Sequence, residues 1–305
     1  LVSVSANAAE LSVSGGASIN MNQYSAGADL NYGGSMTMGN AIVFSGSGEL
    51  DNGLNVSVSY ELDEGAPHVS GGTFDNHSVT VSSDTLGTLI FSGHGGSSAQ
   101  SAVDDMASGD IWDNGFGATG APTSSTSNNM IGYALPSLMD GLDVFLSYDP
   151  QSTAEASVKS EIGYGVTYTG VEGLSVSYGV TDIETGVSTT SGDQTVMKAS
   201  YAYGPITLAA SNNDFDHTTA GNDQEVKSYA ISYSLTDSIS VTYGEETIEK
   251  TGKTSDIEIE GITASYTTGG MTAAITSIEA TNVDHDSTGT NNDNEFWKVS
   301  LSFAF

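Results

Sequence analysis

Residues 296–305 read FWKVSLSFAF, and this stretch alternates between two kinds of side chain. Successive side chains of a β-strand point to opposite faces of the sheet, so the stretch predicts a strand with one apolar and one polar face. The apolar positions are Trp297, Val299, Leu301, Phe303 and Phe305. The polar positions are Lys298, Ser300 and Ser302.

The same period of two recurs along the whole chain, for example in residues 54–60, 174–180 and 229–235. No long stretch has the 3.6-residue period of an amphipathic helix. The pattern predicts sixteen strands, at residues 10–21, 36–48, 53–63, 73–83, 87–93, 129–136, 141–149, 160–170, 173–183, 193–204, 205–215, 224–235, 238–249, 255–267, 271–282 and 294–305.

The predicted connections alternate between short and long. The short ones contain turn-forming residues, as in Asp140-Gly141 and Gly204-Pro205. Longer loops rich in acids, Ser, Thr and Asn are expected near 22–35, 64–72, 94–128, 150–159, 184–192, 216–223, 250–254 and 283–293. Seven turns and eight loops are what an up-and-down antiparallel barrel of sixteen strands requires, whereas a Greek-key sandwich has no reason to alternate in this way.

Composition favours a barrel in a membrane. Hydrophobic residues other than glycine make up 37% of the chain, and no apolar run is long enough for a membrane helix. A transmembrane β-barrel needs only one apolar face per strand, directed at lipid. Tyrosines near strand ends fit an interfacial girdle, although β-propensity alone accounts for them equally well. They are Tyr60, Tyr133, Tyr148, Tyr168, Tyr178, Tyr203, Tyr243 and Tyr266.

We expect one barrel domain over residues 9–305, because Gly, Ser and Thr recur throughout without a linker. Ala6 and Ala8 match a signal-peptidase site, so residues 1–8 are interpreted as a signal-peptide remnant. The alternative is an ordinary first strand that begins at Leu1.

Charge restricts the function classes. The chain has 38 acidic residues, six lysines and no arginine, for a formal net charge of −32. Such a polyanion attracts cations and lacks the basic patch of a nucleic-acid binder. The absence of Cys excludes a disulfide scaffold and thiolate chemistry. The five histidines fall in or near predicted loops without a nucleophile motif, so no enzymatic activity is expected.

Two stretches resemble a known family. The last strand, with its terminal Phe305, looks like the outer-membrane assembly signal, and residues 86–93 followed by the longest loop are similar to the fifth strand of Gram-negative general diffusion porins, the alphaproteobacterial type most of all. The resemblance implies an outer-membrane homotrimer in contact with the lipid bilayer and lipopolysaccharide. It also implies passive diffusion of small hydrophilic solutes and ions, with no required cofactor.

In that family the third loop folds into the lumen and narrows the pore. Here it corresponds to residues 94–129, and its acids Asp104, Asp105, Asp110 and Asp113 are the candidate pore constriction. The alternative is a solvated surface loop. The family usually opposes this loop with arginines, which this chain lacks, so we expect a preference for cations. By strand register, the lumen wall should include Glu61, Asp63, Asp143, Glu161, Lys198 and Lys298.

One loop resembles a calcium-binding loop. Its spacing, D-x-D-x-T-G-x5-E, places oxygen ligands at Asp284, Asp286, Thr288 and Glu295. The departures are a Thr where Asp or Asn is usual and the absence of expected flanking helices. An acidic hairpin loop is the alternative.

Two other functions stay open. A secreted acidic surface-layer or adhesin-type protein would share the Ser, Thr and Gly richness and the absence of Cys, but should show sandwich spacing. A substrate-specific channel would need a graded row of ligand-binding residues in the lumen.

Overall fold

The computed structural model describes residues 10–26, 29–63, 75–99, 129–150, 160–184, 191–285, 287 and 293–305. Residues 1–8, the expected signal-peptide remnant, lie outside this part. Within it, no helix is long and apolar enough to cross a lipid bilayer. The strands are β1 (Glu10–Ala26), β2 (Asp29–Glu49), β3 (Asn55–Asp63), β4 (Asn76–Ser83), β5 (Gly87–His94), β6 (Met130–Ala134), β7 (Leu142–Asp149), β8 (Glu161–Tyr168), β9 (Leu174–Ile183), β10 (Gly192–Tyr203), β11 (Ile206–His217), β12 (Gln224–Thr236), β13 (Ile239–Lys250), β14 (Ile257–Thr268), β15 (Met271–Thr281) and β16 (Asn294–Ala304), and a 3-10 turn, η1 (Val283–His285), follows β15.

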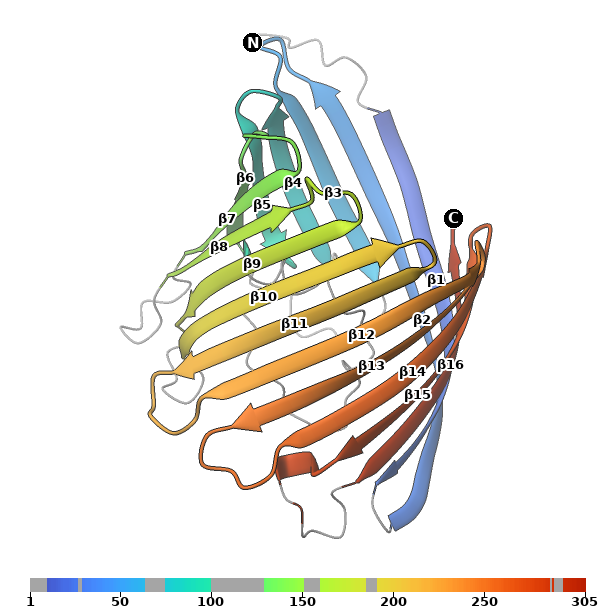
Figure 1. Cartoon of the computed structure of the whole chain (residues 1–305). Helices are drawn as coiled ribbons and strands as arrows, with labels where there is room; N and C mark the ends of the chain where they lie inside the picture. The colour runs from blue at the N-terminus through green and yellow to red at the C-terminus, as the bar shows by residue number, and fades with distance from the viewer. Residues whose placement is uncertain are drawn as a thin grey trace.

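These strands form one closed antiparallel barrel, which confirms the predicted sixteen-stranded all-β fold (Figure 1). Each strand pairs with its neighbours in the chain, and β1 pairs with β16 to close the sheet. At the closure, Gly15 and Phe305 exchange two backbone hydrogen bonds, with N–O distances of 2.9 and 3.0 Å. Closure leaves neither terminal strand with an unpaired edge at this seam.

The turn end of the barrel is tightly built. Gly141 and Gly173 have φ angles of +76°, and a Cβ on either would collide with backbone atoms of the neighbouring hairpin. Glycine is therefore required there by backbone conformation and by space.

The first hairpin corrects one expectation. Residues 22–35 were expected to form a loop, but β1 runs to Ala26 and β2 begins at Asp29. The Gly- and Asn-rich sequence obscures the alternation, but β1 is paired on both sides, by β16 as far as Ala26 and by β2. A ladder on each side holds residues of low β-propensity extended.

The outward face carries the apolar positions. Trp297, Val299, Phe303 and Phe305 are all exposed, and Val299 lies opposite Met21 on β1 and Ile275 on β15. Large exposed apolar side chains continue this surface around the barrel, far beyond the small patches of soluble monomers. The pattern is that of a lipid-facing wall.

The wall is uneven in height. Strands β3–β8 have five to nine residues, whereas β10–β16 have eleven to thirteen. Figure 1 shows the short strands gathered on one side, next to the long β1–β2 hairpin.

Candidate pore lining

The inner faces of β1–β5 are lined mostly by hydroxyl and amide side chains. They include Ser14, Ser18 and Asn20 on β1, Thr37 and Ser45 on β2, Ser57 and Ser59 on β3, Ser78 and Thr80 on β4, and Thr88 and Ser92 on β5. No described inward position of these five strands is buried. This sector of the wall is therefore open to water.

On β8–β16, many inward side chains in the half of the barrel next to the long loops are buried, unlike those of β1–β5. All four inward positions of β8 are buried, and so are Thr181 and Val196 on β9 and β10. Farther round, an apolar cluster faces inward. It contains Ile248, Ile257, Ile259, Ile278, Ala280 and Val283, with Val226 and Phe296 packed against it. Inward residues of a water-filled lumen would be exposed, so this part of the interior is packed with protein.

The predicted wall residues all take the inward register, but they differ in exposure. Asp63 and Asp143 are exposed, and Glu61 is half-buried and accepts a hydrogen bond from Asn76 Nδ2 at 2.7 Å. Lys298 is also half-buried. Glu161 and Lys198 are only 8% and 4% exposed.

Further acids face inward that the sequence reasoning missed, Asp149 and Glu246 among them. Asp149 lies opposite Glu161 in the β7–β8 ladder, and Glu246 accepts a hydrogen bond from Ser228 Oγ at 2.6 Å. The alternation contains the signal for both, because Asp149 follows the outward Tyr148 and Glu246 follows the outward Glu245.

The candidate constriction residues Asp104, Asp105, Asp110 and Asp113 lie outside the described residues. The described start of their loop turns toward the interior. Ala99 is fully buried, and its backbone N–H donates a hydrogen bond to Ser147 Oγ at 2.8 Å. Ser147 takes the inward register of β7, since its neighbour Tyr148 is exposed on the outer face.

The candidate calcium ligands are only partly placed. Glu295 lies within β16 and faces outward, opposite Glu279 of β15. Asp286, Thr288 and the side chain of Asp284 lie outside the described residues. Among the residues that are described, no three His, Asp or Glu side chains form a metal-binding group.

The outer wall carries acids over half of its circumference. They are Asp182, Asp193, Asp214, Asp216, Glu225, Glu245, Glu249, Glu258, Glu260, Glu279 and Glu295, on the loop side of the apolar positions of β9–β16. The outward positions of β3–β8 hold no Asp, Glu or Lys. The barrel thus has an acidic sector, β9–β16, and an uncharged sector that includes β3–β8.

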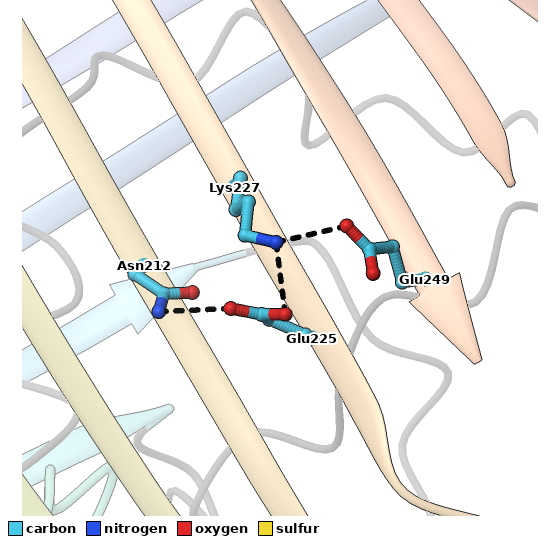
Figure 2. A network of polar contacts seen from close by, with 4 residues as sticks. All are labelled: Asn212, Glu225, Lys227 and Glu249. Carbon is cyan, nitrogen blue, oxygen red and sulfur yellow. Dashed lines mark hydrogen bonds and ion pairs between the residues drawn. The ribbon is translucent and has the colours of Figure 1, made fainter. Parts of the chain in front are cut away.

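One lysine of the described strands faces outward among these acids. Lys227 Nζ contacts Glu249 at 2.8 Å and Glu225 at 2.9 Å, and Asn212 donates to Glu225 at 3.1 Å (Figure 2). Figure 2 shows these side chains bridging three neighbouring strands. Exposed pairs of this kind contribute little stability, and a single lysine leaves most of the outer acids uncompensated.

Comparisons with known proteins agree with this architecture. A family model described as Gram-negative porin matches residues 1–286. An anion-selective porin from Comamonas acidovorans has a TM-score of 0.72 at 16% identity, and the match covers 97% of this chain and 100% of that one. A substituted porin of Rh. blastica gives a TM-score of 0.70 at 16% identity with the same coverage. No curated protein sequence matches the chain significantly.

Proposed function

This chain belongs to the Gram-negative porin family and is an outer-membrane diffusion channel, and from this premise we propose that it prefers cations among the small hydrophilic solutes and ions that cross it. The activity is passive and has no chemical step, as expected for a channel rather than an enzyme. Passage through the channel is proposed to require no cofactor.

The observation that carries the proposed preference is the charge of the wall. The chain has no arginine, and Lys198 is buried. The other inward lysines of the described strands are Lys298 on β16 and Lys250 at the loop end of β13. Glu61, Asp63 and Asp143 face the interior without a cationic cluster to balance them. Rings or clusters of acids in a pore favour cations. The structural relatives do not decide whether cations or anions are preferred, because one of them is an anion-selective porin.

The constriction is proposed to be formed by Asp104, Asp105, Asp110 and Asp113. The inward turn of the chain at Ala99, held by Ser147, supports a loop that enters the lumen. Acids at the narrowest point act over short distances where salt screens them less than it screens surface charges.

Reversal potentials in planar bilayers under a KCl gradient test the proposal. We expect a potential of the sign that reports potassium entering more easily than chloride, and a smaller value at high salt. A channel that conducts without selectivity, or that prefers chloride, overturns the cation preference and leaves the diffusion function intact.

We further propose contact with lipopolysaccharide through the acidic sector. Acids and lipid phosphates repel each other unless divalent cations bridge them, and carboxylates are suitable Ca²⁺ ligands. Calcium at Asp284, Asp286, Thr288 and Glu295 is part of this proposal, supported by the position of Glu295 beside Glu279 on the outer wall. Calorimetric titration of the purified protein with calcium should give saturable heat. A flat titration in chelator-treated protein would remove calcium from the proposal.

We also propose a homotrimer that is assembled through the uncharged sector. Acidic walls repel each other, so copies of this chain should meet where the wall carries no charge. Met36 and Met38 on β2 are 75% and 69% exposed beside that sector and supply apolar contact surface.

A further inference from the structure

We propose that the outer wall of β10–β14 holds one membrane lipid, whose acyl chain lies in a groove of this wall and whose ammonium headgroup pairs with Glu245 and Glu260. The site goes beyond the channel function, because it lies on the outside of the barrel and takes no part in passage through it. It also differs from contact with lipopolysaccharide through bridging calcium, because it needs no divalent cation.

The groove arises where small side chains interrupt the apolar wall. It has a volume of about 550 Å³, and its lining residues are mostly apolar or aromatic. Its floor includes Ala199 and Ala210, which lie opposite each other in the β10–β11 ladder. The next outward row toward the turns consists of the larger Tyr201, Leu208 and Ile231, all of which are exposed. Two alanines beside these residues leave a hollow in the lipid-facing wall.

The groove has the length and direction of an acyl chain. Its floor belongs to one cross-strand row, which contains Ala199, Ala210, Tyr229 and Glu245. Strands lie about 4.8 Å apart, so this row over β10–β13 is roughly 14 Å long, close to half of the ~30 Å hydrocarbon thickness of a bilayer. On β13, Glu245 follows the outward Tyr243 on the loop side, where apolar side chains give way to acids. A chain in the groove would therefore have its headgroup at the border of the apolar band.

The head end of the groove is a pair of carboxylates that share one hydrogen-bond donor. Tyr243 Oη lies 2.8 Å from Glu245 Oε1 and 3.0 Å from Glu260 Oε2. A phenol has one proton, so it donates fully to only one of them at a time. Glu245 and Glu260 are also directly opposite in the β13–β14 ladder, and like charges so placed destabilise a sheet. A cation between the two carboxylates relieves this repulsion.

The described strands supply no lysine to this pair. Their one outward lysine, Lys227, contacts Glu225 and Glu249 instead. An ammonium headgroup brings a positive charge and hydrogen-bond donors to both carboxylates, whereas an anionic headgroup is repelled by them. A second copy of this chain is a poor occupant, because its own acidic wall would meet the same carboxylates.

Native mass spectrometry of the full chain in detergent tests the headgroup. The probes are palmitoyl-oleoyl phosphatidylethanolamine and palmitoyl-oleoyl phosphatidylglycerol, which share their acyl chains and differ in the ammonium group. A chelator is present throughout, so that divalent cations cannot bridge an anionic lipid to the acids. We expect the ammonium lipid to bind roughly fivefold more tightly, the range of exposed ion pairs. Equal binding of the two lipids by the native chain would overturn the headgroup assignment.

A charge-matched pair of variants locates the headgroup. Glu245→Gln combined with Glu260→Gln should abolish the preference for the ammonium lipid. Glu279→Gln combined with Glu295→Gln removes two carboxylates from the same row outside the groove and should keep the preference. The same loss in both double variants would mean that binding follows total charge, and it would overturn the site.

A second matched pair locates the acyl chain. Ala210→Leu fills the floor of the groove and should lower the occupancy by both lipids, whereas Ala264→Leu makes the same change on the outer wall of β14 and should not. Equal occupancy of these two variants would overturn the groove. Heat-modifiable migration on gels checks that each variant is a folded barrel. Conductance is recorded separately, so a failure of the channel function leaves the lipid result readable.

Discussion

At the scale of single residues, the position of a charge in this barrel matters more than its number. Glu61 faces the open sector and is oriented by Asn76, whereas Glu258 points outward from β14. Both contribute equally to the net charge of −32. Only the first can act on a passing ion at short range, because exposed charges are screened within about 8 Å at physiological salt.

Glu61→Gln should therefore reduce cation selectivity by a measurable factor, about twofold in the permeability ratio if one charge contributes a few tenths of a kcal/mol. Reversal potentials in a KCl gradient give that ratio. Glu258→Gln removes the same charge from the outer wall and serves as the control. An equal effect of both variants would mean that selectivity follows total charge rather than position.

The loop acids supply a second test at this scale. Replacing Asp104, Asp105, Asp110 and Asp113 together by Asn should reduce cation preference more than Glu61→Gln does, because four charges are removed near the narrowest point. The measurement is the same reversal potential, in the presence of a chelator to exclude masking by bound divalent ions. An unchanged potential would place these four side chains away from the ion path.

At the scale of elements, the seam between β1 and β16 completes the barrel. Gly15 hydrogen-bonds to Phe305, and a Cβ at position 15 would lie 2.7 Å from the carbonyl oxygen of Ala41 and 3.0 Å from the Phe305 ring. The seam is therefore packed too closely for a larger residue at this position.

Gly15→Val should destabilise the folded barrel by roughly 1–3 kcal/mol, the usual cost of overpacking. Gly46→Ala is the control, since a Cβ there lies 3.5 Å from Val58, an ordinary van der Waals distance. The temperature at which the folded band converts to the unfolded band in detergent gels measures the difference. Equal transition temperatures for both variants would show that the seam tolerates the added volume.

At the scale of the whole molecule, the barrel has two unlike outer walls. The strands β9–β16 are long, and their outer faces carry acids on the loop side of the apolar residues. The strands β3–β8 are short, and their outer faces are uncharged. A chain with this net charge can bring two copies together only where their facing walls are neutral.

Met38→Glu should therefore weaken the proposed trimer, because it places an uncompensated charge in the contact surface. Ile275→Glu adds the same charge to the acidic half of the barrel and should leave assembly unchanged. Native mass spectrometry in detergent reports the subunit number of each variant. A trimer that survives Met38→Glu but dissociates with Ile275→Glu would place the interface on the opposite wall.

The sequence by itself determined the barrel. The period of two is a local property of each strand, and the alternation of turn residues with long polar loops is read directly along the chain, so strand number, topology and the lipid-facing side of β16 followed from the residues alone. The inward register of Glu61 and Lys198 followed for the same reason.

Only the tertiary structure decided which of those inward residues meet water. Glu61 and Lys198 have the same orientation in the alternation, yet Glu61 is only half-buried, whereas Lys198 is buried. The division of the outer wall into two sectors, the extension of β1–β2 through residues 22–26 and 29–35, and the row that aligns Glu245, Glu260, Glu279 and Glu295 across four strands also emerged only from the fold. Burial and cross-strand neighbours depend on residues far apart in the chain, which no local pattern records.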